Sequence, residues 1–212
     1  MIVVECQQGS PEWFEARAGV ITASTFAEIR KRPKSGPNKG GFSVDAQTLA
    51  FRLAIERIGG KPLDEGFSGW AAQRGHELEP IARMHHEALI GQAVNIARFV
   101  KTDDSLFGAS ADGLIGEDGG AEYKCLIAPD RLRTVYLDGD LSEFMDQIQG
   151  CMWITGRKWW HFGLYCPAME SIGKQFWHRE IERDDDYIEA LEADLIEFEK
   201  LVSEYESKLR AA

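Results

Sequence analysis

The densest group of residues that could do chemistry lies between Ala109 and Cys125. Glu122 follows Asp112 by ten residues, and Lys124 comes two residues after Glu122. Short apolar runs around a glycine-rich turn predict a bent pair of strands here. Side chains alternate along a strand, so Glu122 and Lys124 would project from one side, and the returning chain would bring Asp112 beside Glu122. We interpret the following residues as turn residues: Gly113, Gly116, Asp118, Gly119 and Gly120.

Two carboxylates and an ammonium at one spot indicate metal-dependent hydrolysis of phosphodiesters. Mg²⁺ prefers oxygen ligands and usually takes only one or two carboxylates from a protein. The ammonium can orient a water on the metal or help to deprotonate it, and it can stabilise the charge that builds on a phosphate. The same spacing also suits an ordinary hairpin on which Glu122 and Lys124 form a solvated ion pair. Short motifs match by accident, so spacing alone leaves both interpretations open.

A second group of residues, Arg17, Thr22 and Ser24, could bind an anion. A helix start presents free N–H groups and a partial positive charge, and the residues from Thr22 onward have the pattern of such a start. The two hydroxyls would add donors, and Arg17 could hold a phosphate through two parallel hydrogen bonds. In the simpler alternative, Thr22 or Ser24 only caps its own helix and Arg17 is exposed.

Further polar residues lie in two predicted helices. Glu77 or Glu79 could add a carboxylate to the metal site, or both could be exposed helical acids. Gln147 and Gln149 lie in an otherwise apolar helix, where a buried amide needs partners, and one facing the metal site could hold a water or a phosphate oxygen. Three histidines lack the His-Glu-x-x-His spacing of a zinc helix, so we interpret them as solvated or core residues: His76, His85 and His86.

Size and composition limit the class of protein. The 212 residues, 44% hydrophobic and 28% charged, suffice for one sizeable core, and we expect a single domain over residues 1–212. There is neither an apolar run of membrane-spanning length nor a signal-peptide pattern, so we expect a cytoplasmic protein without membrane contact. The four cysteines are widely spaced and favour neither a disulfide framework nor a zinc site.

The net charge of −11 argues against nucleic-acid binding, but the charge is unevenly distributed. Ten acidic and four basic side chains fall within residues 183–210, where a surface helix could face away from DNA. The first forty residues are slightly basic by comparison. The overall charge therefore weakens the case for DNA without excluding it.

The remaining patterns predict helices around a mixed sheet, which is an α/β or α+β fold. Capping residues and apolar periodicity predict helices at residues 11–18, 22–30, 45–58, 70–89, 142–154 and 184–210. Pro80 must kink the helix 70–89 or mark a first turn. Alternating or aromatic and β-branched residues predict additional strands at 93–100, 158–166 and 172–181. The basic residues 31–42, rich in glycine and proline, predict a mobile loop.

Four sequence blocks resemble the lambda-type phage exonucleases, also called YqaJ-like viral recombinases, of the PD-(D/E)xK nuclease superfamily. In order, the blocks are Trp13–Ser24, Arg74–Arg83, Ala109–Cys125 and Gln147–Arg157. The resemblance covers roughly the whole chain, and the shared order of the blocks argues against coincidence. It implies a restriction-endonuclease-like core, in which helices flank a central mixed sheet.

This resemblance also implies an activity and its partners. The expected activity is processive 5′→3′ degradation of one strand of linear duplex DNA, which leaves a 3′ single-stranded overhang for recombination. The expected partners are duplex DNA with 5′-phosphate ends, a single-strand annealing protein and two further copies in a homotrimeric ring. The enzyme would act in the cytoplasm of a bacterial host and be encoded by a phage or prophage. A ring would keep the enzyme on DNA without a strongly basic surface.

The resemblance assigns roles to single residues as well. The implied ligands of one or two Mg²⁺ ions, for which Mn²⁺ can substitute, are Asp112, Glu122, the backbone carbonyl of Tyr123, and Glu79. The implied catalytic residues beside the metal are Lys124, which would activate the attacking water, and Gln147, which would assist near the scissile phosphate. The implied receptors of the 5′-phosphate are Arg17, Thr22 and Ser24.

The chain departs from the family pattern in three places. Ala111 and Leu126 replace prolines that are common in the family, and the one before Asp112 is not a ligand. The segment Phe67–Gln73, around Trp70, does not closely match the segment that we associate with strand separation. Two alternatives remain: an endonuclease of restriction or repair type, which would cut closed circular DNA, and a DNA-binding ring without catalysis.

Overall fold

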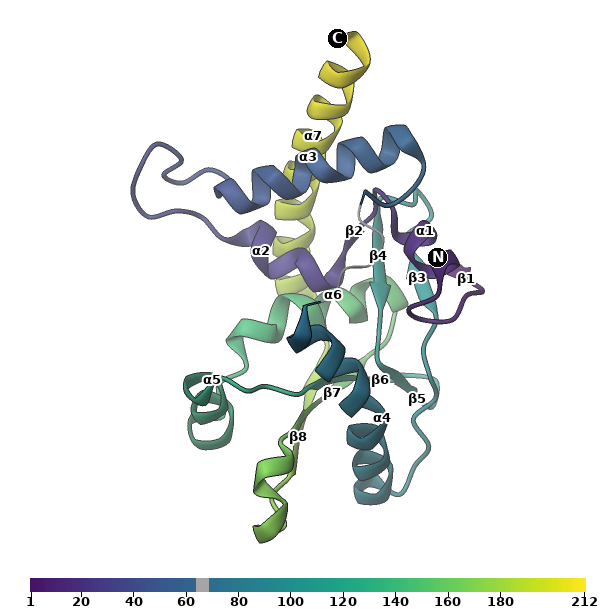
Figure 1. Ribbon diagram of the computed structural model, residues 1–212, viewed down its shortest axis with the longest axis vertical. Helices are drawn as coiled ribbons and strands as arrows, with labels where there is room; N and C mark the ends of the chain where they lie inside the picture. Colours follow the sequence, from purple (N-terminus) through teal and green to yellow (C-terminus); the bar gives the residue numbers. More distant parts are fainter. Residues whose placement is uncertain (64–68) are drawn as a thin grey trace.

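Over the residues that the computed structural model describes, 1–63 and 69–212, the strands form two four-stranded mixed sheets with helices around them (Figure 1). The first sheet has the order β1 (Ile2–Val4), β3 (Phe99–Lys101), β4 (Phe107–Ser110), β2 (Ile21–Thr22). The second has the order β5 (Gly113–Ile115), β6 (Gly119–Lys124), β7 (Trp159–Tyr165), β8 (Phe176–Glu182). The chain passes from one sheet to the other through Ala111 and Asp112. The predicted fold class is confirmed, and the sheet is divided where the predicted catalytic segment begins.

Two of the predicted strands are shorter than expected. Of residues 93–100, only the last two belong to β3, and Asn95 makes a single bridge to Leu114. An alternating pattern favours extended chain, but a strand also needs a neighbour along its length. Residues 167–172 form a 3₁₀-helix, so the strand expected from residue 172 begins at Phe176.

The α-helices of the described residues are α1 (Pro11–Arg17), α2 (Phe26–Arg30), α3 (Val44–Gly59), α4 (Trp70–Ile90), α5 (Pro129–Arg133), α6 (Met145–Thr155) and α7 (Asp185–Ala211). Most of them begin and end close to the predicted residues, but α5 was not predicted and α2 begins four residues later than expected. Side chains of Ser10, Ser43 and Asp184 cap three of them by accepting a hydrogen bond from the N–H three residues on. The helix start expected at Thr22 is wrong, because Thr22 ends β2 and a 3₁₀ turn without a side-chain cap separates it from α2.

Several smaller expectations can be compared with the structure. Pro80 lies in the interior of α4 and not in its first turn. Of the segment Phe67–Gln73, Phe67 and Ser68 lie outside the described residues, and Trp70 is the exposed first residue of α4. Residues 31–42 contain no helix or strand. Within the described part of the chain, no helix combines the length and apolarity that a membrane crossing requires.

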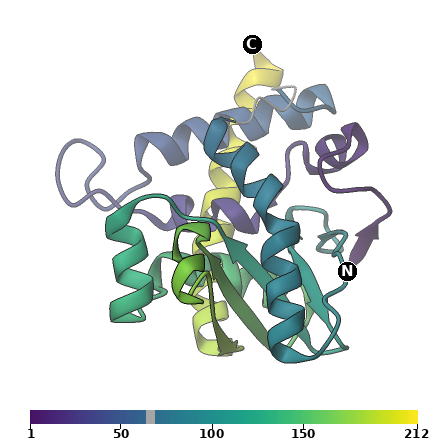
Figure 2. The same cartoon turned by 60° about the horizontal axis from the view of Figure 1, so that its bottom comes forward.

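Helices cover both faces of the second sheet (Figure 2). Helix α4 packs on β6, β7 and β8, while α6 contacts β7 and the first sheet and packs against α7. The main core lies between the sheets and α2, α3, α6 and α7, and it includes Phe26, Trp160 and Phe198. A smaller core lies under α4 and includes Ala82 and Tyr123. The apolar core under α4 is therefore smaller than the core to which α6 and α7 contribute.

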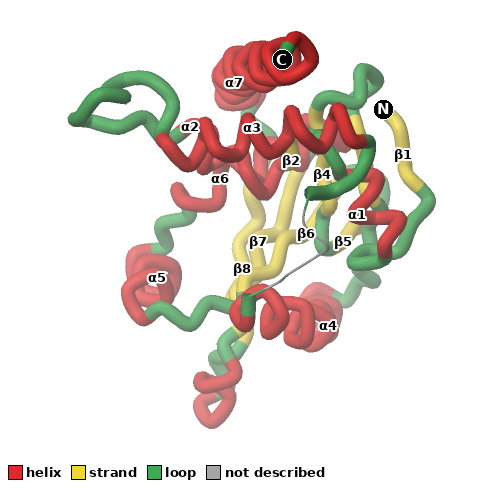
Figure 3. The backbone as a smooth tube through the Cα atoms, turned by 45° about the horizontal axis from the view of Figure 1, so that its top comes forward, coloured by secondary structure: helices red, strands yellow, loops and turns green. Residues whose placement is uncertain are grey.

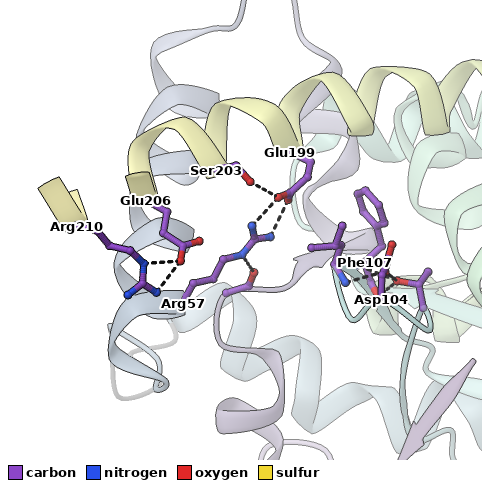
Figure 4. A network of polar contacts seen from close by, with 10 residues as sticks. Arg57, Asp104, Phe107, Glu199, Ser203, Glu206 and Arg210 are labelled. Carbon is purple, nitrogen blue, oxygen red and sulfur yellow. Dashed lines mark hydrogen bonds and ion pairs between the residues drawn. The ribbon is translucent and has the colours of Figure 1, made fainter. Parts of the chain in front are cut away.

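The acidic helix α7 lies away from α4. Its predicted apolar stripe is buried at Ile188, Leu191, Leu195, Phe198 and Val202. Arg57 of α3 donates to both carboxylate oxygens of Glu199 at 2.7 Å, and to the carbonyl of Gly19 at 2.8 Å (Figure 4). Figure 3 shows α7 and α4 on opposite sides of the strands. The negative charge of α7 is thus concentrated far from α4.

The interpretation of the glycines as turn residues is wrong for three of them. Gly116 has a φ of 53° and forms the turn, but Gly113, Gly119 and Gly120 lie within β5 and β6. A Cβ at Gly120 would lie 2.2 Å from Cζ3 of the buried Trp160. The presence of glycine alone does not distinguish a turn from a strand position where a neighbouring side chain leaves no room for a Cβ. These glycines let β6 pack tightly on its neighbours.

We expect Gly120→Ala to lower the free energy of unfolding by about 1–3 kcal/mol, because the added methyl group overlaps Trp160 in a closely packed core. Urea denaturation would measure the change. Gly59→Ala is the matched control, since its Cβ would meet nothing within 4 Å at the end of α3, and stability should be kept or raised by up to about 1 kcal/mol. Equal stability of Gly120→Ala and the wild type would contradict this account of β6.

Candidate active site

The β5–β6 hairpin places Asp112 beside Glu122, as the spacing predicts. The antiparallel register pairs Gly113 with Ala121, so the next residues outward are Asp112 and Glu122. Oδ2 of Asp112 accepts a hydrogen bond of 2.6 Å from the backbone N–H of Tyr123. Strand pairing therefore holds together two carboxylates that would otherwise repel each other.

Lys124 and Gln147 form a closed polar cluster with Glu122. Nζ of Lys124 donates to Oε1 of Glu122 at 2.6 Å and to Oε1 of Gln147 at 2.9 Å. Nε2 of Gln147 donates to the same oxygen of Glu122 at 2.6 Å. Because Gln147 lies near the start of α6, this helix fixes both the ammonium and the carboxylate.

The second carboxylate oxygen of Glu122 is buried without a donor. The residue is 3% exposed, and Oε2 has no hydrogen-bond partner among the described residues. Such an oxygen is unfavourable unless something satisfies it, and a divalent cation would do so. Within residues 1–63 and 69–212, no three His, Cys, Asp or Glu side chains form a metal site by themselves. A cation would therefore combine Asp112 and Glu122 with a backbone carbonyl such as that of Tyr123, an oxygen ligand set that fits Mg²⁺ or Mn²⁺.

Helix α4 contributes Glu79 to the same cavity. Oε1 of Glu79 accepts a hydrogen bond of 2.7 Å from Arg83, one turn further along the helix. Glu77 is exposed and accepts a hydrogen bond from Gln73. Of the two glutamates that the sequence left open, Glu79 is thus the one near the carboxylate pair.

The carboxylates shift one another's pKa. Burial, and then the neighbouring Glu122 and Glu79, raise the pKa of Asp112 well above its usual value. Burial is also the main cause of the raised pKa of Glu79. For Lys124, burial lowers the pKa, but Glu122 and Asp112 outweigh it and hold the pKa above its usual value, so the side chain is an ammonium. With the carboxylates ionised, Asp112, Glu122 and Glu79 are close to a single ammonium, Lys124, and this local balance of charge favours a cation.

Arg17 is a half-buried cation without a carboxylate partner. Its guanidinium donates to Oγ of Ser110 at 3.0 Å and to Oγ1 of Thr22 at 3.3 Å, and it lies 4.2 Å from the centre of the Trp13 ring. None of the ion pairs among the described residues includes Arg17. Burial, and then the nearby Arg52, lower the pKa of Arg17 to about 10, so it remains charged at neutral pH. A desolvated guanidinium of this kind favours an anionic ligand.

Two serines face the cavity together with Arg17. Ser24 and Ser110 line it, whereas Thr22 lines a separate hollow behind Arg17. The hydroxyl of Thr22 lies 3.2 Å from that of Ser24, so Thr22 holds both Arg17 and Ser24 in place. Sequence reasoning missed Ser110. Its position two residues before Asp112, on the same face of an extended segment, is the signal that could have found it.

One cavity of about 570 Å³ joins the two groups of residues. Asp112, Glu122 and Lys124 line one part of it, and Arg17 and Ser24 line another. The side chains predicted to bind a metal and those predicted to bind a phosphate therefore share one solvent-accessible space. The geometry suits a phosphate ester that is held at one point and attacked at another.

A comparison with models of protein families shows the family to which the chain belongs. Residues 12–158 match the model of the YqaJ-like viral recombinase domain. The chain belongs to the YqaJ-like viral recombinase family. A comparison with curated proteins found no match.

Solved structures agree with this family. The YqaJ-like chain is 30% identical to the alkaline exonuclease LHK-Exo from Laribacter hongkongensis, with a TM-score of 0.80 over 95% of this chain and 97% of that one. LHK-Exo in complex with dAMP gives 31% identity and a TM-score of 0.79 over the same shares. A phage-related exonuclease from Haemophilus somnus 129PT shares the fold, at 17% identity and a TM-score of 0.65 over 91% of this chain and 95% of that one.

The remaining polar candidates of the YqaJ-like chain lie outside the carboxylate cluster. Gln149 donates to the carbonyl of Glu182 at 2.9 Å and accepts from the N–H of Asp184 at 3.0 Å, so it joins α6 to the start of α7. His76 lines the cavity and is exposed. His86 is a core histidine, as the spacing favours. Burial, and then two neighbouring histidines, lower the pKa of His86 to about 4, so it is neutral at physiological pH.

We expect Asp112→Asn to stabilise the metal-free YqaJ-like protein at neutral pH. A folded-state pKa above the unfolded one contributes stability below the unfolded pKa, and that contribution is lost as the pH rises through the folded pKa. Asn removes this loss while its Oδ1 can still accept from Tyr123. The Tm difference between variant and wild type should therefore grow from about pH 4 upward, by about 2–4 °C for each kcal/mol.

The exposed Asp130 gives a matched control, since Asp130→Asn should leave the pH dependence of Tm unchanged. Mg²⁺ should raise the Tm of the wild type and not that of Asp112→Asn. A parallel pH dependence for Asp112→Asn and the wild type would show that Asp112 has an ordinary pKa.

Proposed function

We propose that this YqaJ-like protein is a Mg²⁺-dependent exonuclease that degrades one strand of linear duplex DNA from its 5′ end, leaving a 3′ overhang for recombination by strand annealing. The observation that carries the proposal is a single cavity containing both a carboxylate–lysine cluster and a half-buried arginine without a carboxylate partner. Membership of a recombinase family supports it. So does the similarity to LHK-Exo, an exonuclease whose structure was also solved with dAMP, a deoxynucleotide.

The spacing of the two groups favours removal of nucleotides from an end. Ser110, which accepts from Arg17, precedes Asp112 by two residues, so their Cα atoms are at most about 7 Å apart. A 5′-terminal phosphate bound by Arg17, Ser24 and Ser110 would place the next phosphodiester of the strand beside the carboxylates. The reaction would then begin at a phosphorylated 5′ end and proceed in the 3′ direction.

The residues of the cavity divide the chemical work. Asp112, Glu122, the carbonyl of Tyr123 and Glu79 would hold Mg²⁺, or Mn²⁺ in its place. When bound, the ion would supply the charge that polarises the scissile phosphate and lowers the pKa of a water. Lys124 would orient the attacking water and stabilise the charge that develops on the phosphate oxygens.

Gln147 has a supporting part in this arrangement. It accepts from the Lys124 ammonium and donates to Glu122, so it sets the direction in which that ammonium points. An amide fixed in this way would keep Lys124 beside the scissile phosphate throughout the reaction.

The proposal also covers the assembly. Family membership supports a homotrimeric ring around DNA, a single-strand annealing partner and action in the cytoplasm of a bacterial host. A closed ring retains DNA by topology, which suits a chain with a net charge of −11. Sedimentation of the free protein would give its oligomeric state directly.

We expect Lys124→Ala to reduce turnover on linear duplex by about 10²–10⁴-fold while DNA binding remains, because the ammonium acts on the reacting groups. Turnover would be measured with end-labelled DNA and Mg²⁺, and binding with Ca²⁺ in place of Mg²⁺. The exposed Lys158, paired with Asp118, is the control, and Lys158→Ala should behave as the wild type. Unchanged turnover of Lys124→Ala would refute the catalytic assignment.

We expect 5′-phosphorylated linear duplex to be degraded at least about tenfold faster than the same duplex with 5′-hydroxyl ends, since a charge-assisted contact contributes about 1.5–3 kcal/mol. Arg17→Ala should abolish this preference, and Arg17→Lys should restore only part of it because lysine lacks the planar fork. The exposed Arg98 provides a control, and Arg98→Ala should keep the preference.

Closed circular duplex distinguishes the exonuclease from an endonuclease of restriction or repair type. The proposal requires that circles remain intact while linear DNA is consumed. Rapid nicking of circles, together with equal rates on both kinds of 5′ end, would assign the cavity to internal cleavage.

A further inference from the structure

A chain of hydrogen bonds runs from the back of the active-site strand to the protein surface. Nδ1 of His86 lies 2.8 Å from the hydroxyl of Tyr123, and Nε2 of His86 lies 2.8 Å from Nδ1 of His161. Nε2 of His161 lies 3.1 Å from Oε2 of Glu180, which is half exposed to solvent. These four residues, which we call the histidine chain, come from β6, α4, β7 and β8.

The hydrogen bonds of the histidine chain have one consistent set of directions when both imidazoles are uncharged. The carboxylate of Glu180 then accepts from Nε2 of His161, and Nδ1 of His161 is an acceptor. Nε2 of His86 must then donate to His161, which leaves Nδ1 of His86 as the acceptor for the hydroxyl of Tyr123. All four groups are satisfied in one arrangement, with one proton in each bond. Such a network fixes the relative positions of its residues more precisely than apolar packing does.

Helix α4 depends on this chain because its apolar attachment is small. The core beneath it is the smaller of the two, and the fully buried His86 occupies a position where an apolar residue would otherwise pack. Glu79 precedes His86 by seven residues, which is two helical turns, so both lie on the same side of α4. A shift of His86 relative to β6 would therefore move Glu79 relative to the carboxylate pair.

The histidine chain also acts on Tyr123 itself. The N–H of Tyr123 donates to Asp112, while its hydroxyl is held by His86 on the opposite face of β6. Its backbone carbonyl is one of the oxygens assigned to the cation. Tyr123 is thus fixed at both ends, once by the active site and once by α4.

We propose that His86 is a positioning residue for the metal site, which sets the relative placement of Glu79 on α4 and of Tyr123 and its neighbours on β6 through the histidine chain. This inference rests on the proposed function, because it concerns the residues assigned to Mg²⁺. His86 touches neither the cation nor DNA in this role. It acts through Tyr123 and through the helix that carries it.

The test compares His86→Gln and Tyr123→Phe with the wild type in two measurements. One is the Mg²⁺ concentration that gives half of the maximal rise in Tm, and the other is the Mg²⁺ concentration that gives half-maximal degradation of linear duplex. Both concentrations should rise by about 10–100-fold in His86→Gln, and by less in Tyr123→Phe, which loses only the hydroxyl. At saturating Mg²⁺ the rate should recover to within about threefold of the wild type, and the preference for 5′-phosphate should be unchanged.

Two controls separate positioning from general loss of structure. His85→Gln changes the neighbouring residue of α4, which stacks on Tyr165 outside the chain, and Tyr165→Phe removes a hydroxyl from another buried tyrosine. Neither should move the Mg²⁺ midpoints. If His86→Gln does not fold, Tyr123→Phe and the surface variant Glu180→Gln carry the test.

The outcomes also distinguish this proposal from the proposed function. In one outcome the wild type responds to Mg²⁺, while Tyr123→Phe and His86→Gln have a lower Tm but unchanged Mg²⁺ midpoints. This outcome would overturn the positioning role and leave the proposed exonuclease activity intact. A wild type whose Tm and activity ignore Mg²⁺ would overturn both. Raised midpoints with a recovered rate would support both.

Discussion

The cavity depends on one backbone constraint: the pairing of β5 with β6 keeps two carboxylates adjacent although they repel each other. Gly113 is paired with Ala121 across the hairpin, and Asp112 accepts from the N–H of Tyr123, so the carboxylates cannot separate without breaking strand contacts. Like charges held this close in a poorly solvated cavity raise a pKa and favour a cation between them. The arrangement is unfavourable in the metal-free protein, and the rest of the fold has to compensate for it.

That compensation is uneven around the cavity. On the side of α6, a large core and the close approach of Gly120 to Trp160 fix β6, and Gln147 joins the helix to both Glu122 and Lys124. On the side of α4, the core is small and polar contacts hold the helix. Strand pairing therefore determines the positions of Asp112 and Glu122, whereas the position of Glu79 depends on how α4 is attached to the sheet. The two halves of the site are built by different kinds of interaction.

Features that are local in sequence could be predicted, and features made by long-range packing could not. The hairpin that joins Asp112 to Glu122 and Lys124 spans a short segment, so turn and strand patterns sufficed. The helix starts expected at residues 11, 45 and 184 lie within one residue of the observed starts, since a cap needs only its own first turn. The division of the sheet depends on pairing between distant segments of the chain. The contact of Ser110 with Arg17 and the hydrogen bonds of His86 also join segments that are far apart in the sequence. Gly120 was misread because a glycine required by Trp160 looks the same in sequence as one required by a turn.

The net charge of −11 is a poor guide to DNA binding in this fold. Charges in solution are screened over about 8 Å at physiological ionic strength, and the acidic helix α7 lies on the opposite side of the strands from α4. The charged side chains that a phosphate meets in the cavity are three cations, Arg17, Lys124 and Arg131, and three carboxylates. The carboxylates repel the phosphate until a cation neutralises them. Cation and DNA should therefore strengthen each other's binding by the same factor, since linkage is reciprocal. Under the proposed function, affinity for DNA should follow the local balance of charge in the cavity more closely than the charge of the whole chain.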